Sequence, residues 1–304
     1  MIAFLFPGQG SQYSGMGQDL ADNFPVARQT FEEASEALGF DMAALCFSGT
    51  EDDLRLTANT QPAILTCSIA ALRVLEQERD LKPSYAAGHS LGEYSALVSV
   101  GALSLADAVR IVRQRGTFMQ EAVPVGVGAM AAVMGLERPE LEQVCIDAAE
   151  GEIVAAANFN SPGQIVIAGH ATAVTRAMLL AKERGAKRAL PLPVSAPFHS
   201  SLMEPAARRL EETLNNISIG SFLCPVISNV EASPYADQHR VKALLVEQVC
   251  APVRWDESVL KMQELGVSTY VEIGPGKVLS GLVKRISKES SVLNINDVDS
   301  LNKL

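Results

Sequence analysis

The sequence lacks the cysteine and histidine patterns that support disulfides or metal sites. Its five cysteines lie far apart, and none forms a CxxC pair. We therefore expect buried free thiols in a reducing compartment rather than a disulfide framework. The four histidines are scattered as well, so no group of residues has the spacing of metal ligands. No bound metal is expected.

The sequence also lacks long apolar runs and an excess of basic residues. No apolar stretch reaches about 18 residues, the length that a membrane-spanning helix needs. The apolar N-terminal segment, residues 1–8, is too short for a signal sequence and has no basic leader. The net charge of −10 argues against nucleic acid as the main partner, because phosphate binding requires a basic surface. We expect a cytoplasmic protein that binds neither nucleic acid nor a membrane.

The sequence does contain enough apolar residues for a large core, since 48% of its 304 residues are hydrophobic. Short apolar strands and helices of amphipathic spacing fill residues 1–125 and the part after residue 197. The predicted strands there cover residues 2–6, 84–87, 225–228 and 269–273. The predicted helices cover residues 25–38, 61–79, 93–100, 105–119, 202–214, 243–248 and 259–265. The tail from Asp297 is expected to be loose.

Between residues 126 and 196 the predicted elements follow the order β-α-β-β-α-β, the ferredoxin-like split unit. The strands cover residues 129–134, 153–158, 164–168 and 188–194, and the helices cover residues 139–149 and 173–184. We therefore predict an α/β fold with two parts. Residues 1–125 and 197–304 form a hydrolase-like parallel-sheet core, and residues 126–196 form an inserted ferredoxin-like α+β subdomain.

The segment Gly88-His-Ser-Leu-Gly92 is the strongest chemical signal. It fits G-x-S-x-G, follows a predicted strand and opens a predicted helix, which is the context of a nucleophile elbow. Such a turn leaves Ser90 exposed at its tip. The helix N-terminus brings the Leu91 N–H and the positive end of the helix dipole near it. The alternative is a chance match in a turn that starts a helix.

A serine nucleophile needs a base, and His199 is the best candidate. It lies in Ser195-Ala-Pro-Phe-His-Ser200, where the chain re-enters the large domain and can reach the C-terminal edge of the sheet. His89 is expected to point away from Ser90 within the turn. The alternative for His199 is a hydrogen-bonded interdomain histidine. No acidic residue between Ser90 and His199 sits at a convincing strand end, which weakens a plain hydrolase and suggests a backbone carbonyl as the orienting group.

Arg115 is the candidate for recognising the acyl group. Arg110 and Arg113 of the same predicted helix are expected on a solvated face, whereas Arg115 could turn inward. A buried guanidinium matches a carboxylate bidentately, so it would select an acyl group that has a free carboxylate. The loop Gly8-Gln-Gly10 after the first strand has two interpretations. It is either a plain tight turn, or a loop that comes close enough to Ser90 for the Gln9 N–H to form an oxyanion hole together with the Leu91 N–H.

Seven short motifs, taken in chain order from residue 6 to residue 276, resemble the malonyl-CoA:acyl carrier protein transacylase family. They are Phe6-Pro-Gly-Gln-Gly-Ser-Gln12, Thr60-Gln-Pro-Ala63, Ala87-Gly-His-Ser-Leu-Gly-Glu-Tyr94, Arg115-Gly116, Asn158-Phe-Asn-Ser-Pro-Gly-Gln164, Pro191-Leu-Pro-Val194 and Glu272-Ile-Gly-Pro-Gly276. Together they extend over essentially the whole chain.

The resemblance implies transfer of a malonyl group from malonyl-CoA to the phosphopantetheine thiol of acyl carrier protein, in fatty acid biosynthesis. Ser90 would carry the acyl group, His199 would be its base and Arg115 would pair with the malonyl carboxylate. The resemblance implies that the main-chain carbonyl of Gln248 orients His199. Other implied roles are the oxyanion N–H groups of Gln9 and Leu91, a selective bulky residue at Phe198, and a pocket that includes Gln61, His89 and Met119.

The implied enzyme needs no cofactor of its own, because coenzyme A belongs to the substrate and phosphopantetheine to the carrier. We expect a monomer. An acidic carrier should dock on a local basic patch, for which the candidates are Lys182, Arg184, Lys187, Arg188, Lys277, Lys284 and Arg285, although these could be ordinary solvated charges. The alternative functions are a polyketide-type acyltransferase with a different carrier, a serine thioesterase or hydrolase, and a partner-binding module without activity.

Overall fold

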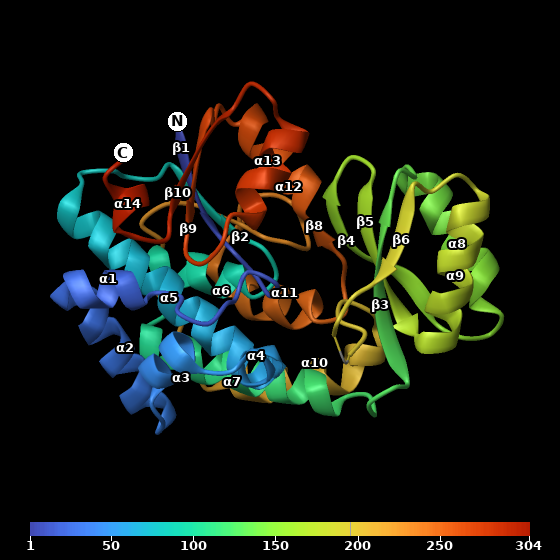
Figure 1. Ribbon diagram of the computed structural model, residues 1–304, viewed down its shortest axis with the longest axis horizontal. Coiled ribbons are helices and arrows are strands. Elements are labelled where there is room, and N and C mark those ends of the chain that lie inside the picture. Colours follow the sequence, from blue (N-terminus) through green and yellow to red (C-terminus); the bar gives the residue numbers. More distant parts are fainter. Residues whose placement is uncertain (195) are drawn as a thin grey trace.

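The protein contains two β-sheets with helices packed on them, and Figure 1 shows the sheets side by side in the computed structural model. The structure describes residues 1–194 and 196–304, so Ser195 of the predicted histidine loop lies outside the described residues. The first sheet has the order β10-β9-β1-β2-β7, and all its pairs are parallel. Its strands are β1 (Ile2–Phe6), β2 (Tyr85–Gly88), β7 (Val226–Ile227), β9 (Thr269–Ile273) and β10 (Ser291–Ile295).

Helices pack around the first sheet. They are α1 (Gln18–Asn23), α2 (Pro25–Leu38), α3 (Met42–Ser48), α4 (Glu51–Arg55), α5 (Thr57–Glu78), α6 (Gly92–Ser99), α7 (Leu105–Glu121), α10 (Glu204–Asn215), α11 (Val241–Gln248), α12 (Trp255–Glu264), α13 (Val278–Ile286) and α14 (Val298–Leu301), with the 3-10 turns η1 (Ser201–Met203) and η2 (Gln238–Arg240).

Both faces of the first sheet are buried, as is usual for parallel sheets. Successive side chains of a strand point to opposite faces. In β1, Phe4 and Phe6 therefore join the core formed with α5, α6 and α7, whereas Ala3 and Leu5 join the core formed with α12 and α13. This two-sided burial explains why β1 is apolar at every position.

The second sheet has the order β6-β3-β5-β4-β8 and mixes parallel and antiparallel pairs. Its chain order is β3 (Gly128–Met134), α8 (Arg138–Ala149), β4 (Val154–Ser161), β5 (Gln164–His170), α9 (Ala171–Glu183) and β6 (Arg188–Pro191). Figure 1 shows α8 and α9 covering the outer face of this sheet. The predicted fold class, a parallel-sheet core with a second α+β unit, is confirmed, and the domain boundaries at 126 and 196 remain a prediction.

A late segment of the chain completes the second sheet. The short strand β8 (Val253–Arg254) precedes α12 and pairs in parallel with β4. Both α12 and α13 contact β4 on one side, and their apolar side chains pack on the first sheet on the other. The two sheets therefore share one set of helices.

Helix α5 begins at Thr57 rather than at residue 61 and contains Pro62. A proline inside a helix lacks the N–H that would pair with the carbonyl four residues earlier. That carbonyl belongs to Ala58, and it lies 3.5 Å from Arg113 Nη1, which donates to it instead. The guanidinium thus compensates for the missing backbone donor.

The expectation of a loose tail from Asp297 is wrong. The Asp297 side chain accepts a hydrogen bond from Ser300 N at 2.7 Å, Ser300 Oγ accepts one from Asp297 N at 3.1 Å, and Leu301 is buried. This reciprocal capping stabilises the short helix α14. The strand β10 before it was not predicted, and β6 ends at Pro191 instead of continuing to residue 194.

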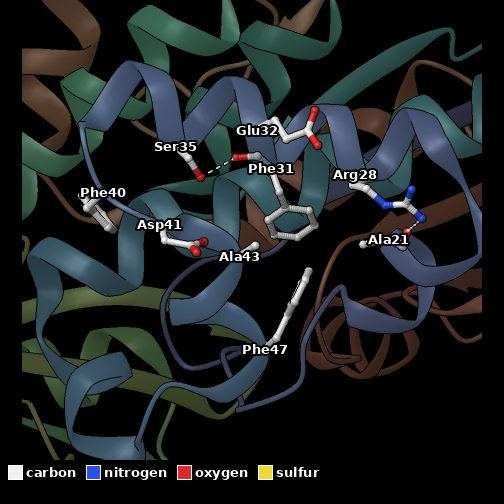
Figure 2. A pocket seen from close by; sticks show the side chains of 9 residues that line it. All are labelled: Ala21, Arg28, Phe31, Glu32, Ser35, Phe40, Asp41, Ala43 and Phe47. Carbon is white, nitrogen blue, oxygen red and sulfur yellow. Dashed lines mark hydrogen bonds between the residues drawn. The ribbon is translucent and has the colours of Figure 1, made fainter.

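A hollow of about 530 Å³ lies beside α2 and α3, away from the residues that carry chemistry in the sequence. Figure 2 shows the rings of Phe31 and Phe47 at this hollow. Three of its polar side chains, Arg28, Ser35 and Asp41, bond to the main chain, as when Arg28 Nη2 donates to Ala21 O at 3.1 Å. Within the described residues, no helix is both long and apolar enough for a membrane crossing, and no His, Cys, Asp and Glu side chains cluster as metal ligands do.

Candidate active site

Ser90 sits in a tight turn between β2 and α6. Its φ of 52° lies in the left-handed region, which is strained for a residue with a side chain. A Cβ on Gly88 would come within 1.9 Å of the Gly92 backbone, and one on Gly92 would come within 2.0 Å of Phe6 O. Both glycines are therefore required for the turn to close on itself and to pack against the end of β1. The Ser90 side chain is partly buried rather than fully exposed.

His199 faces Ser90 from the segment before η1. Ser90 Oγ lies 2.8 Å from His199 Nε2. The other ring nitrogen, Nδ1, lies 2.8 Å from Gln248 O and 3.2 Å from Ala251 O. Carbonyl oxygens only accept hydrogen bonds, so we assign the ring proton to Nδ1. Nε2 is then left as the acceptor for the serine hydroxyl.

The surroundings keep His199 neutral. Its side chain is 4% exposed. Burial lowers the pKa of His199 most, the nearby Arg115 cation lowers it further, and the bonds to Gln248 O and Ala251 O offset this only in part, so that the pKa falls to about 3. At neutral pH the imidazole therefore has a free lone pair on Nε2, which is the state that a general base needs.

Arg115 turns inward from α7, whereas Arg110 is exposed and Arg113 is half-buried. Arg115 Nη1 donates to Gln61 Oε1 at 2.8 Å. Its Nη2 donates to Ser90 Oγ at 3.1 Å and to Gln248 Oε1 at 2.9 Å. The guanidinium fork is thus held beside the nucleophile. Burial lowers the pKa of Arg115 from its ordinary value, and an arginine remains charged despite such a shift.

The loop after β1 packs on the serine turn. A Cβ on Gly8 would lie 2.3 Å from His89 O, so only glycine allows this approach. Within the described residues, neither the Gln9 N–H nor the Leu91 N–H donates a hydrogen bond. Both residues line the same cavity as Ser90, and unpaired amides are the donors that an oxyanion hole uses.

These residues surround a cavity of about 110 Å³. The predicted residues that line it are Ser90, His199, Arg115, Gln9, Leu91, Gln61, Phe198, His89 and Met119. Gln248 lies behind the cavity and contacts it through Arg115 and His199. His89 also bonds away from Ser90, because its Nε2 lies 2.8 Å from Asn160 Oδ1 in β4.

Several residues at this site have no role that the sequence alone predicts. The cavity is also lined by Met130, Asn158, Leu192 and Val194. Of these, Met130 had no signal, whereas the others belong to quoted motifs whose positions in the fold were unknown. Asn229 was missed as well: its Oδ1 accepts from Ser90 N at 2.6 Å, and its Nδ2 donates to Gly88 O at 2.7 Å. It thereby fixes the strained turn from outside.

Three of the seven basic-patch candidates have partners that reduce their availability. Arg184 pairs with Asp147, Lys284 Nζ donates to Ser290 O at 2.8 Å, and Arg285 bonds Gln164. Arg188 is exposed at the start of β6, the strand that leads directly to the cavity wall at residues 192–194. It lies four residues before Leu192, which lines the cavity.

The comparisons with known proteins agree with this geometry. The acyl transferase domain family matches residues 3–303. The malonyl CoA-acyl carrier protein transacylase of Bacillus subtilis (strain 168) is 52% identical over 301 residues, which cover 99% of this chain and 95% of that protein. The chain belongs to the malonyl CoA-acyl carrier protein transacylase family. The Escherichia coli (strain K12) transacylase is 50% identical over 300 residues, covering 99% of this chain and 97% of that protein.

Solved structures of the transacylase family have the same fold. An acyl carrier protein S-malonyltransferase from Vibrio cholerae has a TM-score of 0.97 and 51% identity, and the match covers 99% of both chains. A malonyl-transacylase solved in complex with a type II PKS acyl-carrier protein has a TM-score of 0.97 and 49% identity, covering 99% of this chain and 98% of that one.

Proposed function

We propose that this chain is an acyl carrier protein S-malonyltransferase, which moves a malonyl group from malonyl-CoA to the phosphopantetheine thiol of acyl carrier protein in fatty acid biosynthesis. The observation that carries the proposal is the position of Ser90 Oγ, 2.8 Å from His199 Nε2 and 3.1 Å from Arg115 Nη2. A nucleophile, a base and a guanidinium around one cavity suit the transfer of an acyl group that has its own carboxylate.

The first half-reaction loads the serine. His199 Nε2 takes the proton of Ser90 Oγ while Oγ attacks the thioester carbonyl of malonyl-CoA. The N–H groups of Gln9 and Leu91 stabilise the oxyanion of the tetrahedral intermediate. The carbon–sulfur bond then breaks, and the imidazolium returns its proton to the leaving thiolate of coenzyme A. The product is malonyl-Ser90 with a neutral His199.

The second half-reaction uses the same groups in reverse order. The phosphopantetheine thiol of the carrier gives its proton to His199 and attacks the malonyl ester. Collapse of the second tetrahedral intermediate breaks the bond to Ser90 Oγ, which regains the proton. Apolar walls at Phe198, Leu192 and Val194 limit the access of water, which favours transfer over hydrolysis.

Arg115 supplies the selectivity for malonyl. Its Nη2 is close enough to Ser90 Oγ that a carboxylate on a short acyl group can replace the serine contact and bind the fork. The buried phenyl ring of Phe198, next to the base, restricts the width of the acyl group. We propose that both residues act together, one attracting the carboxylate and the other excluding branched chains.

The carrier, the oligomeric state and the cellular location belong to the same proposal. An acidic acyl carrier protein docks beside the cleft at a basic surface that includes Arg188. The enzyme acts as a monomer in the cytoplasm, which agrees with its five free cysteines. A polyketide-type carrier is the second candidate, because a relative of 49% identity was solved with a type II PKS carrier.

The test is to follow the acyl group on the protein itself. The purified chain is mixed with malonyl-CoA and its intact mass is measured, first without and then with holo acyl carrier protein. We expect a malonyl-sized mass increase that disappears when the carrier is added, and no increase for Ser90→Ala. An adduct that persists in Ser90→Ala would exclude Ser90 as the nucleophile, and release of free malonate without a carrier would favour a hydrolase.

A further inference from the structure

A buried carboxylate that the proposed steps do not use lies beneath the serine turn. Glu93, in the first turn of α6, is 1% exposed. Its Oε2 accepts hydrogen bonds from Gln248 Nε2 at 2.6 Å and from Asn229 N at 3.1 Å, and its Oε1 accepts one from the hydroxyl of Tyr235. Burial disfavours the charge of a carboxylate, and these three donors offset part of that cost.

Glu93 determines which way the Gln248 amide points. The amide nitrogen of Gln248 donates to Glu93 Oε2 and also to Ser90 O, at 3.1 Å. The same Oε2 accepts from the Asn229 backbone N–H, so it faces Gln248 as an acceptor and the NH₂ group of the amide must face it. The amide oxygen is then left facing Arg115 Nη2 at 2.9 Å. In the flipped orientation, oxygen would face carboxylate and NH₂ would face guanidinium, and both contacts would be repulsive.

This orientation affects the groups that would handle the acyl chain. Gln248 Oε1 anchors one nitrogen of the Arg115 fork, while Gln61 Oε1 anchors the other. The main-chain carbonyl of the same Gln248 accepts from His199 Nδ1 at 2.8 Å. One residue therefore orients both the guanidinium and the imidazole, and Glu93 holds its side chain.

Electrostatics link the same groups. The charged and titratable groups that act on Glu93 are Tyr235, on the segment after β7, and Arg115, on α7, while Gln248 and Asn229 are its neutral partners. Burial raises the pKa of Glu93 to about 7, against these hydrogen bonds and the Arg115 charge, which lower it. The carboxylate and the guanidinium thus lie on opposite sides of one amide and reduce each other's cost of burial.

We propose that Glu93 is a positioning residue for malonyl selection: it fixes the Gln248 amide so that Arg115 presents its fork to the acyl group on Ser90. The inference rests on the proposed function, because Glu93 acts by orienting the Arg115 guanidinium that binds the malonyl carboxylate. Glu93 does not touch the cavity and takes no part in bond making. Its effect is on which acyl group is accepted.

The test compares malonyl-CoA with acetyl-CoA as acyl donors to Ser90. The readout is the ratio of the two kcat/KM values for loading the serine. Glu93→Met keeps the length of the side chain but removes both acceptors, so the Gln248 amide is free to flip. We expect the malonyl-to-acetyl ratio to fall about tenfold or more, with acetyl loading changed far less than malonyl loading. Arg115→Ala removes the guanidinium itself, so its malonyl-to-acetyl ratio gives the largest loss of selectivity that this mechanism can produce.

Two further variants separate positioning from folding. Glu93→Gln keeps an acceptor for Gln248 Nε2, and its NH₂ group can donate to the Tyr235 oxygen, so the ratio should stay within about threefold of wild type. Glu272→Gln is the matched control, since Glu272 is a buried carboxylate that caps α13 through Leu279 N and Ser280 N, at 3.0 and 2.7 Å. It should lower thermal stability and leave the ratio unchanged.

The outcomes distinguish the inference from the proposed function. A folded Glu93→Met that keeps the wild-type ratio overturns the positioning role while malonyl loading of the wild type still stands. Failure of the wild type to load malonyl overturns both. If Glu93→Met does not fold, Gln248→Met breaks the same link from the other side and keeps the main-chain carbonyl for His199. It should show the same loss of ratio, and an unchanged ratio would refute the inference.

Discussion

His199 stays neutral in the folded protein because burial and the Arg115 cation both disfavour an imidazolium. The two carbonyls at Nδ1 fix the tautomer, and the free Nε2 faces Ser90 Oγ. The residues around His199 therefore fix which ring nitrogen carries the proton before the substrate binds. The same reasoning applies to the Gln248 amide, whose orientation is fixed by an acceptor on one side and a donor on the other.

A histidine whose pKa is depressed on folding makes stability depend on pH. The unfolded chain binds a proton at His199 below a pKa of about 6.5, whereas the folded chain does so only near 3. The stabilising contribution is therefore present above pH 6.5 and is lost as the pH falls toward 3. The stability advantage of wild type over His199→Asn should shrink by about 1 kcal/mol between pH 7 and pH 5.5.

Urea unfolding of both proteins at the two pH values measures this difference. Glu93 has a raised pKa, so its own contribution changes with the opposite sign over this range, but it is present in both proteins and cancels in the comparison. A stability difference that does not change with pH would mean that His199 is hydrated, or already protonated, in the folded state.

Among the secondary-structure elements, the pair β2 and α6 shows how glycine controls the site. A Cβ on Gly92 would meet Phe6 O at 2.0 Å, so Gly92→Ala must push α6 away from β1. We expect a loss of about 2 kcal/mol or more in the free energy of unfolding, together with slower loading of Ser90. Gly281 in α13 is the matched control, because a Cβ there has no neighbour within 4 Å.

The control should change stability in the opposite direction. Gly281→Ala replaces a poor helix former by a good one in open space, so it should stabilise the protein by roughly 0.5–1 kcal/mol and leave loading unchanged. Chemical unfolding and intact-mass kinetics of both variants provide the measurements. Equal effects at the two positions would show that helix propensity, rather than the close approach to β1, decides the cost.

Helices, strands and turns were predictable from the sequence where the residues that determine them are close together in the chain. The G-x-S-x-G turn and the β-α-β-β-α-β order were predicted because turn residues and periodicity lie within a few residues of each other. Strand β10 was missed because its pairing with β9 and its contacts with α13 and α14 are not visible in the local sequence. The bond between Gln248 and Glu93 joins residues 155 positions apart, and no short motif predicts such a meeting.

At the scale of the whole molecule, the cleft exists because the two sheets are joined through α12 and β8. Arg138 of α8 bonds Glu257 of α12 at 2.6 Å and stacks on the ring of Phe159 in β4, 3.7 Å from its centroid. Together with the bond from His89 to Asn160, these contacts hold the second sheet against the serine turn. Leu192 and Val194, which follow β6 and its first residue Arg188 in the chain, line the cavity on this side.

This arrangement predicts that charge at Arg188 acts on the carrier half-reaction alone. Arg188→Glu should lower kcat/KM for the acyl carrier protein about tenfold at low salt, and the loss should diminish as salt screens the interaction. Loading of Ser90 by malonyl-CoA, measured without the carrier, should keep its rate. Arg208→Glu on α10 is the control, because Arg208 is also exposed and pairs with Glu204 in its own helix. If both variants lose carrier transfer equally, the effect is one of net charge, and the docking surface lies elsewhere. If Arg188→Glu also slows the loading of Ser90 by malonyl-CoA, Arg188 binds the coenzyme A thioester.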